Sequence, residues 1–283
     1  MTLRLLTVHA HPDDESSKGA ATLARYAAEG VDVLIATCTG GERGDILNPA
    51  VDTAETRADL PAIRRREMAA AAGILGVRQC FLGFTDSGLP GEGEPLPEGC
   101  FAATPLEEAT APLVALIRDF RPHVVITYDE TGGYPHPDHI RTHEVTVEAF
   151  AAAADPARYP GAGEPWQPQK LYYQATLSRA WFQALHDATV AAGLESAMGD
   201  VLEELPAEDA LAVTTRIRCE AHFATRDRAL LAHTTQVDPA HPFFAHSREI
   251  ERQVWPYEDY HLAHPAQAGP ETDLFAGVTG VRP

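Results

Sequence analysis

The amino-acid sequence predicts an α/β protein: a Rossmann-like, mostly parallel sheet with helices on both faces, and a smaller mixed C-terminal lobe. In the first half of the chain, short apolar runs alternate with amphipathic segments of helical length. These runs are apolar throughout, which is typical of strands covered on both faces of a parallel sheet. With 283 residues, 45% of them hydrophobic, the chain suffices for one large domain or a domain with an appended lobe.

Strands and helices are predicted to alternate over the first half. The expected strands are residues 3–10, 31–39, 79–84 and 123–129. The expected helices are residues 16–30, 61–76, 105–120 and 140–154. Gly30 supplies a stop for the first helix, and Pro61 suits the first turn of the second.

The second half of the chain has a less regular pattern. The expected strands are residues 170–176 and 211–218, and the expected helices are residues 178–194 and 219–233. The strand at 211–218 alternates polar and apolar residues, as an exposed strand does. The Gly/Pro-rich segments 88–100 and 156–168 are predicted as long surface loops. We therefore predict a Rossmann-like core over residues 1–176 and an α/β lobe over 177–283, the alternative being one continuous domain.

Charge and cysteine content narrow the function classes. The formal net charge is −19, which argues against nucleic-acid binding because phosphate recognition needs clustered cations. No apolar segment approaches the roughly 18 residues that span a bilayer, and no signal peptide is visible, so we expect no membrane association. The four cysteines form no Cys-x-x-Cys pair and indicate free thiols in a reducing compartment, hence a cytoplasmic protein.

Histidines and acids gather where two predicted strands end. The first strand runs into "HAHPDDE" (residues 9–15), and the strand at 123–129 runs into "DETGGYPHPDH" (129–139). In open parallel sheets, ligands bind beyond the carboxyl ends of strands, so both stretches can reach one crevice. Either cluster alone could be structural, since acids cap helices. Two such clusters on one sheet favour a shared metal ion.

Zinc fits this set of side chains. Imidazole and carboxylate are ordinary zinc ligands, and a catalytic zinc uses three of them and keeps one position for water. His11, Asp14 and His139 match that description, which leaves Asp13 free to take a proton from the water. Zinc lowers the pKa of such a water to roughly 7.

The sequence lacks the motifs of several other classes of active site. The first strand is not followed by a Gly-x-Gly-x-x-Gly turn, and the chain has neither a Gly-x-Ser-x-Gly elbow nor a Walker loop. A metal-dependent phosphoesterase would need a second metal and more acids near the first.

The motifs "AHPDDE" and "HPDH" resemble those of the zinc-dependent LmbE/PIG-L family of N-deacetylases. The resemblance covers nearly the whole chain. It is closer to the family's branch of actinobacterial amidases that act on mycothiol S-conjugates, through "TGGERGDILNPA", "GEPWQPQKLYY" and "WPYEDYHLA".

The resemblance implies a role for each matching position. His11, Asp14 and His139 match the zinc ligands, and Asp13 matches the general base. His136 matches a histidine that stabilises the oxyanion; either it or Asp13 protonates the leaving amine.

Further positions match residues around the reacting bond. Asp138 would orient the His136 ring, and Tyr134 matches a mobile tyrosine that polarises the substrate carbonyl. The positions expected to contact substrate are Lys18, Asp45, Arg64 and Asp86. Asp45 stands where the related deacetylase has a glutamate, and Lys18 matches a lysine typical of the amidase branch.

The resemblance implies hydrolysis of a small-molecule thiol–sugar conjugate. A mycothiol S-conjugate would be cleaved to a mercapturic acid and glucosaminyl-inositol, with one Zn²⁺ per chain and Fe²⁺ as the alternative metal. The C-terminal lobe would complete the cleft, with the aromatic, Pro-rich stretch 242–260 facing the variable conjugated group. The first alternative is deacetylation of N-acetylglucosaminyl-inositol, and the second is a non-catalytic zinc- or sugar-binding module. The sequence leaves the oligomeric state open.

Overall fold

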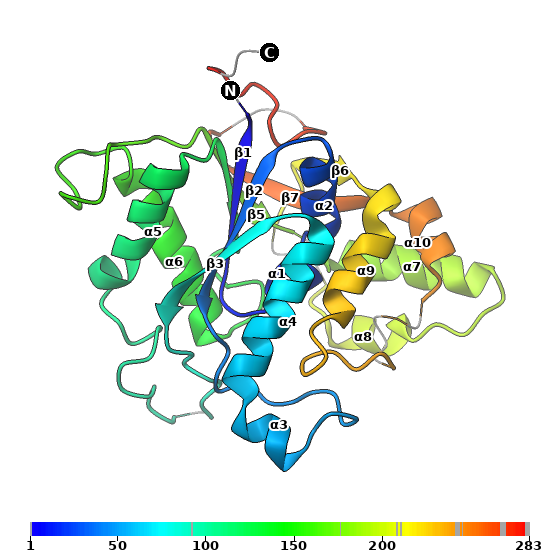
Figure 1. Ribbon diagram of the computed structural model, residues 1–283. Helices are drawn as coiled ribbons and strands as arrows, with labels where there is room; N and C mark the ends of the chain where they lie inside the picture. The colour runs from blue at the N-terminus through cyan, green and yellow to red at the C-terminus, as the bar shows by residue number, and fades with distance from the viewer. Residues whose placement is uncertain are drawn as a thin grey trace.

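A computed structural model describes residues 2–91, 93–175, 177–207, 209, 211–240, 244, 246–266 and 270–280. Its strands form one seven-stranded sheet in the order β3-β2-β1-β4-β5-β7-β6 (Figure 1). The strands are β1 Arg4–His9, β2 Asp32–Thr39, β3 Arg78–Phe84, β4 Val124–Thr127, β5 Lys170–Gln174, β6 Thr215–Arg218 and β7 Tyr257–His264.

The sheet is mostly parallel, as predicted. Strands β3, β2, β1, β4 and β5 pair in parallel, β7 runs antiparallel to β5, and β6 runs antiparallel to β7. The order reverses at β1: the chain moves outward through β2 and β3, then returns to place β4 on the other side of β1. The β1–β4 pair is therefore the topological switch point of the sheet.

Helices cover both faces of the sheet, which confirms the predicted fold class. They are α1 Asp14–Ser17, α2 Ala20–Ala28, α3 Ala54–Ala58, α4 Leu60–Leu75, α5 Leu106–Phe120, α6 Pro137–Ala152, α7 Arg179–Ala191, α8 Met198–Glu204, α9 Phe223–Leu231 and α10 Arg248–Val254, with a short 3₁₀ helix at Glu220–His222. Helices α5 and α6 lie on one side of the sheet and α2, α4 and α9 on the other (Figure 1).

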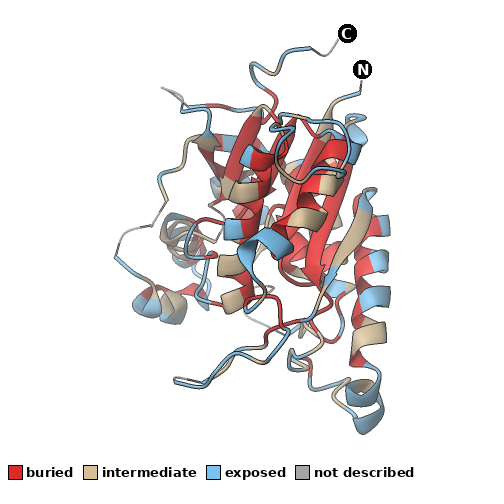
Figure 2. Cartoon of the chain, turned by 90° about the vertical axis from the view of Figure 1, so that its left-hand side faces the viewer, coloured by how far each residue is buried: buried red, intermediate tan, exposed pale blue. Residues whose placement is uncertain are grey.

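The side chains of the central strands divide between two hydrophobic cores, one on each face of the sheet. Leu5 packs with the residues of α2, α4 and α9, whereas its neighbour Leu6 packs with those of α5 and α6. Val33 and Leu34 divide in the same way, because successive strand side chains point to opposite faces. The central strands are consequently buried on both sides (Figure 2). The outer strand β6 instead alternates buried and exposed residues, as its sequence predicts.

The first predicted helix is interrupted. Residues 16–30 form the end of α1 and then α2, with the break at Gly19, whose φ is +87°. A Cβ atom at Gly19 would lie 2.9 Å from Oη of Tyr260, so the close approach of β7 requires glycine. The break leaves α1 as one turn at the end of β1.

Helix α6 begins three residues earlier than predicted. His136 caps it by accepting the N–H of Asp138 at 3.1 Å, and Pro137 occupies the first helical position. The "HPDH" motif therefore sits on the first turn of a helix. Helices α3, α8 and α10 and strand β7 were absent from the prediction; β7 carries two buried acids, Glu258 and Asp259, and so lacks an apolar pattern.

Strands of the predicted C-terminal lobe continue the main sheet. Glu258 on β7 accepts the N–H groups of Ala21 and Thr22 at the start of α2, at 3.1 and 2.7 Å. The ammonium of Lys170 on β5 lies 2.7 Å from Glu271 and is buried with it. The division at residue 176, which itself lies outside the described residues, stays a prediction. Among the described residues, no helix combines the length and apolar character needed to cross a bilayer.

A buried ion pair joins α9 to α10. The guanidinium of Arg226 donates two hydrogen bonds of 2.9 Å to Glu251, and His246 lies 3.1 Å from the same carboxylate. Burial opposes ionisation of Glu251, but the hydrogen bonds from His246 and Arg226 outweigh it and lower its pKa to about 2.

We predict a pH-dependent contribution of this pair to stability. Because the folded pKa of Glu251 lies below its ordinary value of 4.5, ionised Glu251 stabilises the fold above about pH 4.5, and the contribution is lost as the pH falls toward 2. Its size is about 3 kcal/mol. Urea unfolding of the wild type and of Glu251→Gln should differ by about that amount at pH 7, and the difference should shrink toward zero near pH 2. A difference that stays constant with pH would contradict this account.

Candidate metal centre

The carboxyl ends of β1 and β4 bring the two polar stretches together at the switch point. The chain leaves β1 at His9 and turns at once into α1, so His11, Asp13 and Asp14 lie directly above the strand end. Strand β4 ends at Thr127 and is followed by the loop that leads to α6. Ligand sites of open α/β sheets form at this position.

Three buried side chains converge there. One ligand atom each from His11, Asp14 and His139 can be chosen so that all lie within 4.8 Å of one another. Oδ2 of Asp14 lies 3.3 Å from Nε2 of His139 and 3.6 Å from Nδ1 of His11. The structure thus brings together the three residues that the sequence singled out as ligands.

His139 is prepared to bind a cation. Its Nδ1 lies 2.9 Å from the carbonyl oxygen of Gly132, which fixes the hydrogen on Nδ1 and leaves a lone pair on Nε2. Nε2 is buried and has no hydrogen-bond partner among the described residues. A Cβ at Gly132 would lie 2.5 Å from Cβ of His139, so this loop needs glycine to approach the ring. A divalent metal beside Asp14 would satisfy the free nitrogen, and the donor set suits zinc.

The second nitrogen of His11 faces two further acids. Nε2 lies 3.2 Å from Asp138 and 3.5 Å from Asp86. Burial lowers the pKa of His11, but Asp138, Asp14 and Asp86 outweigh it and raise that pKa well above the ordinary value. The acids around this ring therefore create a potential that attracts positive charge.

The carboxylate of Asp138 contacts Ser87 and His11. It accepts hydrogen bonds from both N and Oγ of Ser87, the first at 2.9 Å. Among the described residues it makes no hydrogen bond to the His136 ring, which is instead fixed by the backbone N–H of residue 138. A role for Asp138 in orienting His136 stays a prediction, and its observed contact supports His11.

Asp13 occupies a strained backbone conformation beside the three ligands. Its φ is +112°, which costs a non-glycine residue roughly 1–3 kcal/mol. Two buried side chains hold the turn: Glu15 accepts the N–H of Asp13 at 2.9 Å, and Arg64 donates to Pro12 O at 2.7 Å. Burial and the nearby Asp14 raise the pKa of Asp13, while Arg64 opposes them. A raised pKa suits a group that must accept a proton near neutrality.

Glu15 is held in turn by His233. Nε2 of His233 lies 2.7 Å from Glu15, and both side chains are fully buried. Neither residue was predicted as part of the site. Glu15 belongs to the "HPDDE" stretch and could have been found there, but no local signal connects residue 233 with residue 15.

His136 and Tyr134 face the ligands from the α6 side. Burial and repulsion by His11 lower the pKa of His136 to about 4. Because Nδ1 accepts the Asp138 N–H, the neutral ring carries its hydrogen on Nε2. Tyr134 is 45% exposed, and its ring centroid lies 4.4 Å from that of His139. Burial and the charge of Asp14 raise the pKa of Tyr134, so its hydroxyl keeps its hydrogen.

Lys18 reaches the same centre from the end of α1. Its ammonium donates to Oδ1 of Asp14 at 2.8 Å and lies 5.9 Å from the ring centroid of Tyr134. Lys18 therefore contacts one carboxylate oxygen of Asp14, and His139 lies beside the other.

A polar pocket of about 270 Å³ opens above the centre. It includes the predicted substrate residues Asp45, Arg64 and Asp86, together with Arg43 and Gln236, which were not predicted. The N–H of Arg43 donates to Asp86 at 2.9 Å. Arg43 lies two residues before Asp45 in "ERGD", so the motif could have indicated it.

Two charged residues of the pocket are already engaged within the protein. Arg64 donates to Gly41 O at 2.8 Å and to Asp13 at 3.2 Å in addition to its bond to Pro12. Burial opposes ionisation of Asp86, but His11 and two backbone N–H groups outweigh it and lower its pKa. Contact of Arg64 and Asp86 with a substrate stays a prediction, as it does for Lys18 and Asp45.

The fold and this cluster define a parallel α/β protein with a candidate metal centre at its switch point. A family model of GlcNAc-PI de-N-acetylase (PIG-L) matches residues 6–150, which carry both motifs. Mycothiol S-conjugate amidase of Streptomyces coelicolor is 52% identical over 287 residues, covering 98% of this chain and 97% of that protein. The chain belongs to the PIG-L (LmbE) family, which confirms the resemblance seen in the sequence.

Other relatives agree with this assignment. 1D-myo-inositol 2-acetamido-2-deoxy-α-D-glucopyranoside deacetylase of Streptomyces avermitilis is 42% identical, with 97% of each chain covered. A solved structure of a conserved protein from Thermus thermophilus is 25% identical with a TM-score of 0.62, covering 95% of this chain and 98% of its own. N,N'-diacetylchitobiose deacetylase from Pyrococcus horikoshii shares the fold at 18% identity and a TM-score of 0.63, covering 98% of this chain and 86% of its own.

We predict that the purified chain binds one zinc ion and that His139→Ala loses it. Loss of an outer-shell partner alone weakens metal binding about 10- to 100-fold, so loss of a ligand should weaken it more than about 100-fold. Metal analysis and competition with a chelator measure the affinity. His264→Ala is the matched control, because this exposed residue pairs with Leu171 near the start of β5 and so lies at the opposite edge of the sheet. Equal zinc content in His139→Ala and the control would show that His139 is not a zinc ligand.

Proposed function

We propose that this chain is a metal-dependent amidase that hydrolyses mycothiol S-conjugates to a mercapturic acid and glucosaminyl-inositol. The observation that carries the proposal is the buried His11–Asp14–His139 cluster, with Asp13 beside it, in a chain 52% identical to a mycothiol S-conjugate amidase. The free cysteines suit a reducing compartment, so we place the protein in the cytoplasm.

The metal would be held by His11, Asp14 and His139. We propose Zn²⁺, with Fe²⁺ as the alternative, because two imidazoles and one carboxylate suit either ion. When bound, the ion supplies Lewis acidity that favours ionisation of water and polarises a carbonyl oxygen.

The protein's own groups perform the proton transfers. Asp13 accepts the proton of the attacking water, for which its raised pKa and its position beside Asp14 are suited. Nε2–H of His136 and the hydroxyl of Tyr134 donate to the oxygen that gains negative charge, each donor contributing about 3–4 kcal/mol in comparable sites. The departing amine takes the proton that Asp13 accepted from the water, because an amine leaves poorly unless it is protonated. His136 is the alternative donor only as an imidazolium, a form that its lowered pKa disfavours.

The polar pocket suits the sugar side of such a substrate. Its acids and arginines offer hydrogen bonds to a polyhydroxylated ring, and its lining is more polar than apolar. In this proposal Asp45, Arg64 and Asp86 contact glucosaminyl-inositol. The ammonium of Lys18 contacts the Asp14 carboxylate and lies 5.9 Å from the centroid of the Tyr134 ring.

Deacetylation of N-acetylglucosaminyl-inositol is the second candidate. The 42% identical relative carries that activity in its name, and the same proton transfers would cleave an acetamide. The two candidates differ only in the acyl group that leaves the sugar nitrogen.

We predict that the bimane conjugate of mycothiol is hydrolysed with a kcat/KM at least about tenfold above that for N-acetylglucosaminyl-inositol, a difference of about 1.4 kcal/mol. Both rates are measured on the same zinc-loaded preparation, by release of the fluorescent mercapturic acid and of the free amine. A reversed ratio would favour the deacetylase. Zinc binding without turnover of either compound would indicate a binding module.

We predict that Asp13→Asn lowers kcat about 10²- to 10⁴-fold while zinc content stays at one per chain. The amide cannot accept the proton, but the three ligands remain. Arg66→Gln, a change on the exposed face of α4, serves as the control. Unchanged kcat in a folded, zinc-loaded Asp13→Asn protein would remove Asp13 from the mechanism.

A further inference from the structure

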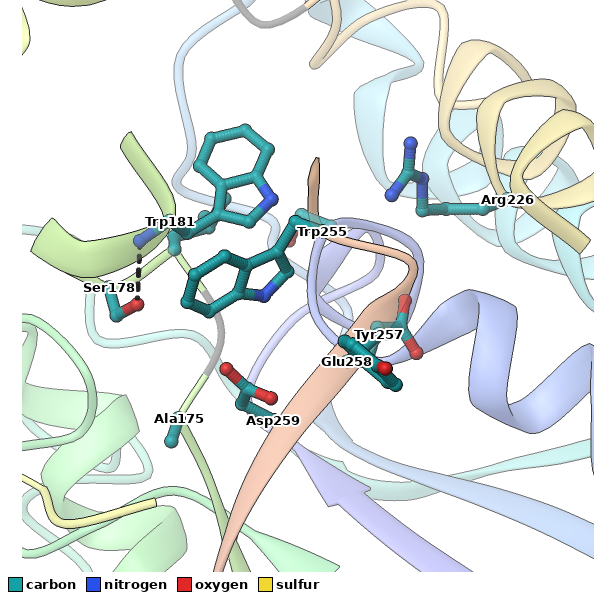
Figure 3. Close-up of a pocket in the computed structure, with 10 residues that line it drawn as sticks. Ala175, Ser178, Trp181, Arg226, Trp255, Tyr257, Glu258 and Asp259 are labelled. Atoms are coloured by element: carbon teal, nitrogen blue, oxygen red, sulfur yellow. Dashed lines mark hydrogen bonds between the residues drawn. The ribbon is translucent and has the colours of Figure 1, made fainter. Parts of the chain in front are cut away.

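A small hollow lies at the end of α1, beside Trp181, Trp255 and Asp259 (Figure 3). Ser17, the last residue of α1, belongs to its wall. The hollow measures about 30 Å³, which holds about one water molecule and no part of a substrate. The stretch 242–260 supplies Trp255 and Asp259 here, its residues 242, 243 and 245 lie outside the described residues, and its contact with a conjugated group stays a prediction. On this side, therefore, protein contacts alone set the position of α1.

Glu15 connects the start of α1 with a distant part of the chain. It is fully buried, and its two carboxylate oxygens have different partners. Oε2 accepts the N–H of Asp13 at 2.9 Å. Oε1 accepts hydrogen bonds from Oγ of Ser16 and from Nε2 of His233, the latter at 2.7 Å. All three partners are donors, so Glu15 acts as a carboxylate, and Nε2 of His233 carries a hydrogen whether or not the ring is charged.

His233 gives this carboxylate a fixed point outside α1. Ser16 adjoins Glu15 and moves with it, whereas His233 belongs to a segment that is held separately. The backbone N–H of His233 donates to Leu230 O at the end of α9, at 3.1 Å, and its carbonyl oxygen accepts the N–H of Gln236 at 2.9 Å. The imidazole therefore projects toward Glu15 from a backbone that is fixed on both sides.

Helix α4 anchors both the segment of His233 and the carboxylate of Asp13. Glu67 accepts hydrogen bonds from N and Oγ1 of Thr235, at 2.8 and 2.7 Å. Arg64 lies one helical turn earlier and donates to the carboxylate of Asp13 at 3.2 Å. Asp13 thus receives Arg64 directly on its side chain, while its N–H is held through two residues whose support leads back to the same helix.

The conformation of Asp13 makes this support necessary. Its φ of +112° is unfavourable for a residue with a side chain and persists only where the surroundings hold it. A buried carboxylate without a donor is also strongly unfavourable. If the donor at residue 233 is lost, Glu15 turns to another donor and releases the N–H of Asp13. The Asp13 carboxylate then moves relative to the proposed metal ligands.

We infer that His233 is a positioning residue for the reaction: through Glu15 it holds Asp13 where that carboxylate accepts the proton of the attacking water. The inference rests on the proposed function and adds to it a residue far from both sequence motifs. His233 is not among the residues that line the polar pocket, and it acts without touching the substrate. Its loss should therefore lower kcat and leave KM nearly unchanged.

The test compares two substitutions that differ by one methylene. In His233→Gln the amide nitrogen can take the place of Nε2 and donate to Glu15, whereas in His233→Asn it is too short to reach. With the zinc-loaded protein and the bimane conjugate of mycothiol, His233→Asn should lower kcat about 10- to 100-fold and change KM less than about twofold. His233→Gln should keep kcat within about threefold of the wild-type value.

His123→Asn is the matched control. His123 is a buried histidine that precedes β4, at the end of the sheet opposite the metal centre, and its Nδ1 accepts the N–H of Arg4 at 3.1 Å. This variant should leave kcat unchanged. Urea unfolding shows whether each variant is folded before its rate is compared.

Hydrogen exchange of the peptide that spans residues 10–16 follows the position of Asp13 without turnover. The Asp13 amide is protected by Glu15 and should exchange about tenfold faster in His233→Asn than in the wild type. His233→Gln and His123→Asn should exchange at nearly the wild-type rate.

Equal kcat in folded, zinc-loaded His233→Asn and His233→Gln, or a loss that appears in KM alone, would overturn the inference even if the wild type hydrolyses the conjugate. If His233→Asn does not fold, Glu15→Asp shortens the same link from its other end. It should lower kcat by a similar factor, and a wild-type kcat there would overturn the inference. If the wild type hydrolyses neither the conjugate nor N-acetylglucosaminyl-inositol, the proposed function fails, and hydrogen exchange alone decides whether His233 holds Asp13.

Discussion

Parallel pairing of β1 with β4 is the constraint on which the candidate site depends. The register that aligns Leu5 with Val124 and Thr7 with Ile126 sets two strand ends level, although more than a hundred residues separate them in the chain. His11 and Asp14 then meet His139 without any long loop having to fold over. Burying several acids in one place is unfavourable unless positive charge accompanies them. Lys18 and Arg64 supply part of that charge, and a cation bound at the free Nε2 of His139 would supply the rest.

Much of the fold and the meeting of His11, Asp14 and His139 at one place was predictable because both depend on local patterns. The strands β1 to β4 are short apolar runs between amphipathic helices, a pattern that is typical of buried parallel strands. The motif residues directly follow two of these strands, so their meeting at one edge follows from the topology. What the pattern could not give was the start of α6 at Pro137, because the capping contact of His136 depends on its ring position.

The parts that escaped prediction depend on contacts distant in the sequence. The break at Gly19 exists because Tyr260 packs against it. Tyr260 lies on β7, a strand that the sequence pattern does not indicate because its buried acids interrupt the apolar run. The support of Asp13 by Glu15, which His233 holds in turn, is similar, since residue 233 follows the end of α9 in a distant part of the chain. The local pattern of polar and apolar residues does not indicate partners that are distant in the sequence. The strained turn at Asp13 is consequently held by two buried side chains, those of Glu15 and Arg64.

The hydrogen bonds of Glu258 and Glu271 have a consequence for the family's shared segment. The family match spans residues 6–150, which hold every proposed metal ligand. Yet the start of α2 is capped by Glu258, and Glu271 neutralises Lys170 next to the last parallel strand pair. Cutting the chain after the matched segment would expose the amide groups of Ala21 and Thr22 and leave one edge of β4 unpaired. The matched segment thus depends on partners from beyond residue 150, and a minimal fragment would have to retain the C-terminal strands to keep them.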